Sequence, residues 1–409
     1  MMSDQAIKDS DVLDGLNVKY LKFFGLWRVV NDFRTTGKRN KILRVKIFIT
    51  LVLVLPYILC QYLSYFVIKV DIQKAIFLNL HLLPGTQICC KIVVFWFKIE
   101  SQCKLFDLLK KDFLSVPEEM RPEAAEIFKK ITRRTNKLCL AAFIVNISII
   151  ISSIADPAIS VDYILYHTGD MAAVTTGKKK MLGGWYPVPM AETPYYELIY
   201  VYEAVAGTLG GFLLAMYVCL FYQVLMCLYA QFTILCLKTS ALKIKSDNGR
   251  INSSIYKELN EILKEHQKLL SYAKELRSVY NPLVTLIIGI GLFILIIAIF
   301  QFLFGGKSDF MFIFKSLQLL VYQCVEVSMF CFGSTYIETA SSDLQFAIYS
   351  SDWYMTGMKF RKEAQMMMIR ATKGETLTAL RVYPINVETI MSILHFTYSA
   401  SAVVSRMAE

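Results

Sequence analysis

PINVETIMSILHFTYSASAVVSRM, at residues 384–407, is an apolar run interrupted by serine, threonine and histidine. It comes after an amphipathic stretch with tyrosine and tryptophan, SSDLQFAIYSSDWYMT at residues 341–356, and a basic stretch. Polar side chains inside a membrane helix are costly unless they face protein or water. The quoted run therefore predicts a last membrane helix that borders a conduit rather than a lipid-facing anchor.

Six further apolar runs precede this one. Hydrophobic residues make up 55% of the 409-residue chain, whereas soluble domains contain about 45–50%. A helix that crosses a bilayer needs about 17–25 mostly apolar residues. We therefore expect an all-α, seven-helix membrane protein that forms one membrane domain over residues 1–409. The seven spans are Ile47–Ile68, Ala75–Phe97, Leu138–Ile154, Glu197–Leu220 (continuing as a helix to about Leu237), Leu283–Phe304, Met311–Thr335 and Val387–Val404.

Lysine and arginine are distributed unevenly between the segments that join these spans. Segments 1–45, 98–137, 238–281 and 338–383 together hold 34 of them, and the alternate segments 69–74, 155–196 and 305–310 hold 6. Because such residues gather in short cytoplasmic loops, we expect the N-terminus inside and the C-terminus outside. This topology accounts for the net charge of +11. No basic stripe indicates a nucleic-acid partner.

The long helices are expected to extend into the cytosol and form an inner anchor domain. Residues 251–280 have apolar residues at helical spacing and predict a helix, with Asn281-Pro282 opening the next one. The outer loop mixes turn formers with aromatic residues, which favours an ordered cap. The chain divides into a cytosolic amphipathic N-terminus at 1–46, helices 1 to 6 at 47–337 with the outer loop 155–196, a cytosolic segment at 338–383, and a last helix at 387–405.

The sequence contains no recognisable catalytic or metal-binding arrangement. Its four histidines are isolated, and no nucleotide-binding glycine loop or nucleophile motif is present. None of the ten cysteines lies in the outer loop, where a disulfide could form. We expect neither an enzyme nor a cofactor. A transporter would show inverted repeats, which we do not find. A G-protein-coupled receptor would place its N-terminus outside, against the charge distribution.

Polar residues inside the predicted spans point to a ligand site. They are His81, Lys91, Glu203, Lys315 and Glu326. Such residues in a membrane default to functional roles, although ordinary interhelical packing explains any one of them. His81 and Glu203 lie in the outer halves of their spans, near several tyrosines. Aromatic side chains with a few polar groups suit a small, mostly apolar ligand.

The last span has two faces that could border the conduit. One is polar at each helical step and contains Glu388, Ser392, His395 and Ser399. The neighbouring face includes Thr397 and Ser401. Small polar residues also permit close helix packing, so packing remains an alternative. One helix cannot enclose a pore, but several subunits around an axis can.

The whole chain resembles the insect odorant receptor family, most specifically in its C-terminal quarter. The matching residues are Ser342-Asp343-Leu344 with Ala347 and Tyr349, Asp352-Trp353, the basic run Lys359–Lys362, Arg370-Ala371 and Thr397-Tyr398-Ser399. The resemblance implies a tetrameric, odorant-gated, non-selective cation channel in which odorant-specific subunits assemble with a shared co-receptor. It also implies a multi-pass protein of the plasma membrane, in the dendrite of a sensory neuron.

The resemblance also implies site residues. Gustatory receptors and the co-receptor carry a glutamine where this chain has Val404-Ser405, which favours an odorant-specific subunit; a gustatory-type or G-protein-coupled chemoreceptor is the alternative. The co-receptor's gate residue corresponds to Ser401. The polar Glu388–Ser399 face would then pack on its own bundle, and the pore residues would be Thr397, Ser401, Val404 and Ser405. Depth in the membrane and helical facing, and not the resemblance, select the residues that we expect to contact the odorant: Phe77, His81, Ile150, Ser153, Tyr200, Glu203, Gly207, Leu317 and Leu320.

Overall fold

A computed structural model of the chain describes residues 41–67, 72–110, 113–159, 181, 184–189, 194–242, 246–247, 250–251, 253–304, 310–351, 353–380 and 382–408. Residues 1–40 of the predicted N-terminal segment lie outside these ranges, as does most of the predicted outer loop. The predictions for those segments therefore lie outside the described part of the structure.

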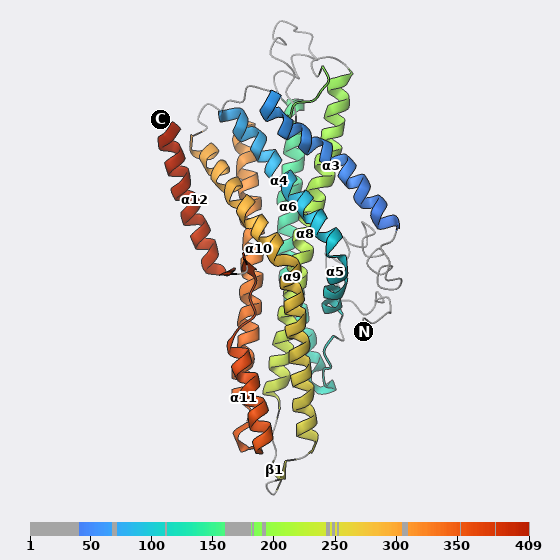
Figure 1. The fold of residues 1–409 in the computed structure, drawn as a ribbon, viewed down its shortest axis with the longest axis vertical. Coiled ribbons are helices and arrows are strands. Elements are labelled where there is room, and N and C mark those ends of the chain that lie inside the picture. The colour runs from blue at the N-terminus through green and yellow to red at the C-terminus, as the bar shows by residue number, and fades with distance from the viewer. Residues whose placement is uncertain are drawn as a thin grey trace.

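Most of the described chain is helical, and long helices run side by side along the molecule (Figure 1). Two short antiparallel hairpins, β1–β2 and β3–β4, join consecutive helices. The elements are α3 Lys41–Val67, α4 Ile72–Phe97, α5 Ile99–Leu105, η2 Phe106–Leu109, η3 Glu118–Met120, α6 Arg121–Ile159, α8 Tyr195–Ser240, β1 Ser246–Asp247, β2 Arg250–Ile251, α9 Ser253–Phe304, α10 Phe310–Tyr349, η5 Trp353–Met355, α11 Met358–Thr372, β3 Thr378–Ala379, β4 Tyr383–Pro384 and α12 Val387–Ala408.

The core lies around α8, the central helix. In its most apolar stretch, 83% of the residues are buried, compared with 33% for α4 and for α6. The ring of Phe221 on α8 lies 4.1 Å from that of Tyr280 on α9 and 4.7 Å from that of Phe330 on α10. Aromatic pairs at these distances stabilise a core beyond their buried area. α8 therefore holds α9 and α10 in one bundle.

Five described helices are long and apolar enough to cross a membrane, and Val52–Val67 is a shorter apolar helical stretch. Several helices extend well past the predicted spans: α6 already begins at Arg121, and α8 continues to Ser240. The prediction that Asn281-Pro282 opens a helix is wrong. Pro282 lies inside a continuous α9, where the burial of Tyr280, Leu283 and Val284 offsets the lost backbone hydrogen bond.

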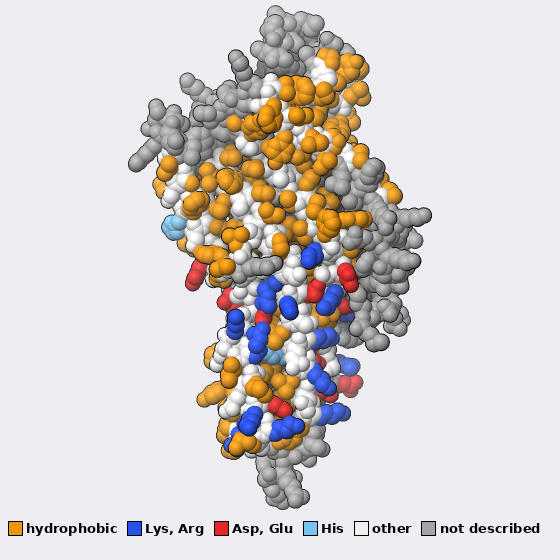
Figure 2. All heavy atoms as spheres, in the orientation of Figure 1, with side chains coloured by type: hydrophobic (Ala, Val, Ile, Leu, Met, Phe, Trp, Pro, Cys, Tyr) orange, Lys and Arg blue, Asp and Glu red, His pale blue; other side chains and the backbone are white. Residues whose placement is uncertain are grey.

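Figure 2 shows how the side chains divide the visible face of the molecule. Hydrophobic side chains cover the half of the molecule that contains α3 and α4. Lysine, arginine and acidic side chains appear in the half that contains α11. An apolar exterior is stable only where lipid or protein covers it. The division therefore separates a membrane half from a charged half along the same long helices.

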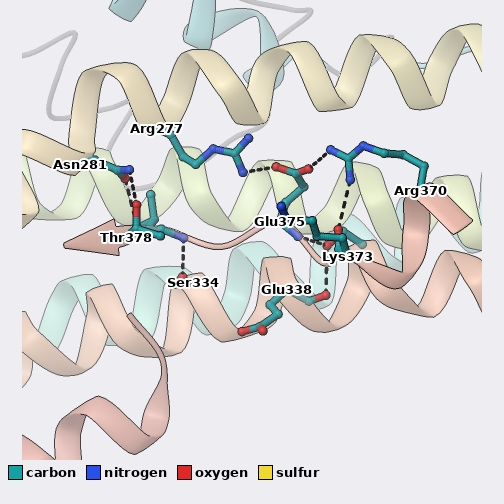
Figure 3. Close-up of polar contacts among 10 residues, drawn as sticks. Arg277, Asn281, Ser334, Glu338, Arg370, Lys373, Glu375 and Thr378 are labelled. Carbon is teal, nitrogen blue, oxygen red and sulfur yellow. Dashed lines mark hydrogen bonds and ion pairs between the residues drawn. The ribbon is translucent and has the colours of Figure 1, made fainter. Parts of the chain in front are cut away.

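In the charged half, the segment between α11 and α12 is fastened to α9 and α10 (Figure 3). Glu375, 4% exposed, pairs with Arg277 of α9 and Arg370 of α11. The backbone N–H of Leu377 donates to Ser334 Oγ of α10 at 2.9 Å, and Asn281 Nδ2 donates to Thr378 Oγ1 at 2.7 Å. These bonds fix the point from which α12 starts.

Candidate ligand cavity

A cavity of about 140 Å³ lies between five helices in the membrane half. It is bordered by α3, α4, α6, α8 and α10, with Met181 from the segment before α8. Apolar side chains make up most of its wall. The lining residues are Val54, Tyr57, Leu80, His81, Pro84, Gly85, Ile88, Asn146, Ile149, Ile150, Ser153, Met181, Ala206, Gly207, Gly210, Gly211, Leu214, Lys315, Leu319 and Tyr322.

Glycines of α8 make room for the cavity and for the close approach of α6. A Cβ atom at Gly211 would lie 2.9 Å from Ile150 Cδ1 and 3.2 Å from Asn146 Oδ1. A Cβ atom at Gly207 would be 3.4 Å from the Met181 methyl group, which is ordinary contact. Gly211 therefore sets the spacing between α6 and α8, whereas Gly207 borders open space.

The charged group at the cavity is neutralised across helices. Lys315 Nζ of α10 lies 2.6 Å from Asp156 Oδ2 of α6, and both side chains are buried. Beside this pair, Ser152 Oγ donates to Gln318 Oε1 at 2.7 Å, and Gln318 Nε2 donates to Ser148 Oγ at 3.0 Å. A buried charge is tolerated when it is paired and hydrogen-bonded. The cavity therefore suits an uncharged ligand.

A second buried ion pair joins α4 to α10. Lys91 Nζ lies 2.7 Å from Glu326 Oε1, with side chains 2% and 1% exposed. The partners are 235 residues apart in the chain. Both intramembrane lysines that the sequence singled out thus have acidic partners on other helices.

Hydrogen bonds fasten the segment before α8, which contributes Met181 to the cavity wall, to neighbouring helices. The backbone N–H of Trp185 donates to Ser64 Oγ at 2.7 Å, and Tyr186 OH donates to Glu203 Oε1 at 2.8 Å. These bonds tie the described part of this segment to α3 and α8. Glu203 therefore holds the segment before α8 in place and is not among the residues that line the cavity.

Four of the nine residues predicted to bind the odorant, namely His81, Ile150, Ser153 and Gly207, line this one cavity. Tyr200 donates from its hydroxyl to Ile154 O at 2.7 Å and lies outside the lining. Leu320 packs against the main hydrophobic core around α8, and Leu317 is 41% exposed. The remaining residue, Phe77, lies in α4, and its side chain is outside the described ones.

The last helix departs from the predicted facing. Thr397 is completely buried, and its Oγ1 donates to Ile393 O at 2.6 Å. The predicted pore residues Ser401, Val404 and Ser405 lie in α12, and their side chains are outside the described ones. The polar residues expected to pack inward, which are Glu388, Ser392, His395 and Ser399, are instead exposed. The resemblance fixed the register of α12, but the packing of α12 on α9 and α10 decides its buried face.

Sequence reasoning missed several lining residues. Asn146 was not singled out, although it is a buried amide within an apolar span. Gly210 and Gly211, one turn from Gly207, form a small-residue face of the kind that permits close helix approach. Asp156 was placed in the outer loop because Asp-Pro commonly begins a turn, yet α6 continues to Ile159.

Long apolar helices around a mostly apolar cavity define a helical membrane protein with an internal hollow. The chain belongs to the 7tm Odorant receptor family, whose sequence profile matches residues 80–398. The resemblance to insect odorant receptors is thereby confirmed. The chain is therefore a membrane protein, as its long apolar helices also indicate.

Individual relatives agree with this assignment. Odorant receptor 22a of Drosophila melanogaster is 24% identical over 184 residues, covering 44% of this chain and 45% of the relative. Odorant receptor 24a of the same species is 27% identical over 182 residues, covering 43% and 45%. The chain thus spans less than half the length of the curated relatives it matches.

The fold matches solved structures over nearly the full chain. The insect olfactory receptor OR5 from Machilis hrabei, in complex with eugenol, aligns with a TM-score of 0.76 at 15% identity, covering 95% of this chain and 98% of that one. A second OR5 structure aligns with a TM-score of 0.75 at 17% identity. At these identities the likeness establishes the fold.

Proposed function

We propose that the chain is an odorant-specific subunit of a ligand-gated, non-selective cation channel, and that it binds a small, uncharged volatile in the cavity between α3, α4, α6, α8 and α10. The observation that carries the proposal is this mostly apolar cavity of about 140 Å³ between five helices. An apolar cavity of about 150 Å³ binds benzene. A compact molecule of similar size, held mainly by shape and apolar contact, fits the same space.

Ligand binding would favour an open state by contacts that differ between the two states. Helices α6, α8 and α10 border the cavity, and α12 packs on α10, so a shift of α10 beside the cavity would reach α12. We propose that the chain assembles as a heterotetramer with co-receptor subunits in the plasma membrane of a sensory dendrite, N-terminus inside and C-terminus outside.

The proposed conduit for monovalent and divalent cations runs along α12. The exposed polar stripe Glu388, Ser392, His395 and Ser399 supports this reading, because such a stripe is unsuited to lipid. Several chains around one axis would turn their stripes toward a shared, water-filled path. Ser401, Val404 and Ser405 stay proposed for its outer end.

The test is current recording with a panel of volatiles, with and without a co-receptor. Gly207→Leu fills the cavity, so we expect odorant-evoked current to fall at least tenfold while the amount of protein at the cell surface stays the same. Leu317→Ala is the matched control on the exposed face of α10, and we expect its response to be unchanged. Equal effects of the two variants would exclude the cavity as the odorant site.

A G-protein-coupled or gustatory-type chemoreceptor remains the alternative function. An epitope tag at the N-terminus separates the G-protein-coupled case, because our proposal requires that the tag be inaccessible on intact cells. An accessible tag would overturn the orientation.

A further inference from the structure

A second and larger hollow lies in the charged half, away from the ligand cavity. Its volume is about 1300 Å³. One wall is the first part of α6, another is the segment around Phe113–Val116, and Glu265 and Lys268 of α9 also border it. The hollow begins near Arg121 and reaches Leu140, which lies two residues inside the predicted membrane span of α6. It therefore crosses the boundary between the charged half and the membrane half.

The α6 wall carries a basic ladder. Lys129, Arg133 and Lys137 follow one another at four-residue steps and are exposed. None of the three has an ion pair or hydrogen bond within the described part of the chain. Like charges four residues apart on a helix destabilise it, so the ladder is suited to an anion from outside the described part of the chain.

The same face of α6 continues directly as an apolar stripe. Leu140, Ile144, Ile147 and Ile151 follow at three- and four-residue steps, and they are 48%, 58%, 39% and 61% exposed. Positive charge alone is expected at any cytoplasmic boundary. A basic hollow that leads without a break into an exposed apolar stripe matches a molecule with an anionic head and a hydrocarbon tail.

Hydrogen bonds within the chain already hold the wall that lies opposite the basic ladder. Glu265 accepts from Lys238 Nζ at 2.9 Å and from Ser115 Oγ at 2.6 Å, which neutralises the acidic lining residue. Lys268 Nζ donates to Phe113 O at 2.6 Å and stands 3.9 Å from the centre of the Phe113 ring. The hollow is thus held open by bonds between the loop, α8 and α9, and its free charge is positive.

We propose that this hollow binds an anionic phospholipid of the cytoplasmic leaflet, with its phosphate groups on Arg133, Lys137 and Lys129 and its acyl chains along the apolar stripe of α6. Basic pockets between helices on the cytoplasmic side recognise phosphoinositide and similar headgroups, and arginine binds phosphate through paired hydrogen bonds. The volume and the several cations suit a headgroup with more than one phosphate. The proposal rests on the proposed orientation of the chain, with the N-terminus inside.

The test uses the full-length chain in nanodiscs of phosphatidylcholine. Dioctanoyl phosphatidylinositol bisphosphate is titrated, and binding is followed by native mass spectrometry and by the midpoint of thermal unfolding. Arg133→Gln with Lys137→Gln removes two charges from the ladder. The matched control is Lys130→Gln with Arg134→Gln, which removes the same two residue types from positions of α6 that do not line the hollow.

We expect the lipid to bind the wild type and the control equally, within about twofold, and the ladder variant roughly 30-fold more weakly, at about fivefold per cation. Dioctanoyl phosphatidylcholine and soluble inositol trisphosphate should bind far more weakly than the bisphosphate lipid. An equal loss of lipid affinity in the two variants would show that the lipid responds to the total positive charge of α6 and not to this hollow, which would overturn the proposal. Inositol trisphosphate binding as tightly as the lipid would show a soluble-anion site and overturn the proposal.

Three further outcomes would contradict it. If no lipid binds and the ladder variant instead changes the oligomeric state, the hollow is a contact between subunits. If no lipid binds while odorant-evoked currents persist, the lipid site fails and the proposed channel function stands. An N-terminal tag accessible from outside would remove the orientation on which the lipid site depends.

Discussion

The two halves of the molecule hold α10 to its neighbours in different ways. In the membrane half, two ion pairs, Lys315–Asp156 and Lys91–Glu326, join α10 to α6 and α4 among apolar side chains. In the charged half, Glu375 lies between two arginines within a continuous set of hydrogen bonds (Figure 3). The membrane half also contains the ligand cavity, and the charged half fastens the start of α12.

This difference indicates where the structure can change. The side chains around Lys315 border a cavity and have room to rearrange, whereas moving the segment at Glu375 breaks several bonds at once. Ligand-dependent motion is therefore expected between α4, α6 and α10 near the cavity, with the charged half as the fixed frame. Four variants test this comparison.

The largest effect is expected for the pair that is most deeply buried. Lys91→Met leaves Glu326 without its partner, and breaking a buried pair costs about 3–5 kcal/mol. We expect most of the protein to be lost on detergent extraction, with a markedly lower midpoint of thermal unfolding. Lys91→Met combined with Glu326→Leu should recover much of the loss, because an apolar pair of similar volume is often neutral. An unfolding midpoint like the wild type in the single variant would contradict this.

A pH effect is expected in the charged half at His266, which is 4% exposed. Burial, aided by the positive charge of Arg370, lowers the pKa of His266 to about 4, while Glu375 opposes the shift. The folded pKa lies below the unfolded value of about 6.5. The neutral ring therefore contributes stability above pH 6.5, and this is lost as the pH falls to 4, on the order of 3 kcal/mol.

Unfolding midpoints measured from pH 7 to pH 4 check this expectation. His266→Gln should flatten the slope over that range, because glutamine does not titrate. A variant with the same slope as the wild type would place the acid sensitivity elsewhere.

A smaller effect is expected for Glu375→Gln. The two arginines lose their carboxylate but are 31% and 44% exposed, so water compensates part of the loss. We expect a destabilisation of about 2 kcal/mol, seen in thermal unfolding. The odorant concentration for half-maximal current should stay within about threefold. A large change in odorant sensitivity would show that this segment takes part in gating and is not only a frame.

The smallest effect on stability is expected at the glycine that spaces α6 from α8. Gly211→Ala pushes on Ile150 but gains about 1 kcal/mol of helix propensity, so unfolding should change little. Because Ile150 lines the cavity, half-maximal activation should shift by roughly tenfold, or about 1.4 kcal/mol. Gly207→Ala, which meets only ordinary contact, is the control. Equal shifts in both would contradict the proposed role of Gly211.

Hydropathy and charge predicted the long helices and their order, because a membrane helix is recognisable in the sequence as a long apolar run. The partners across helices could not be predicted in the same way. Lys91 and Glu326 are 235 residues apart, and Lys315 and Asp156 are 159 apart, so no local spacing connects them. The conformation at Asp156-Pro157 and at Asn281-Pro282 was decided by tertiary packing, which overrode the local preference of proline.

The residues proposed for the odorant gather only partly in one place. His81, Ile150, Ser153 and Gly207 line the candidate cavity, whereas Leu317 is 41% exposed. Because α10 is apolar nearly all round, its sequence gives no periodic signal for its buried face, and the neighbouring helices determine it. In α12, Thr397 was expected to line the pore and is buried within the chain, because α12 packs on α9 and α10.

The central position of α8 has a consequence for how the protein is made. α8 has 46 residues, a length of roughly 69 Å, about twice the roughly 30 Å hydrocarbon layer. The part of α8 that continues into the charged half packs on α6, α9 and α10, and the last two are synthesised after it. At about 5–20 residues per second, the ribosome needs roughly 5 to 20 s to reach the end of α10. During that interval this apolar part of α8 lacks the neighbours that α9 and α10 provide, so its core is complete only once α10 has been made.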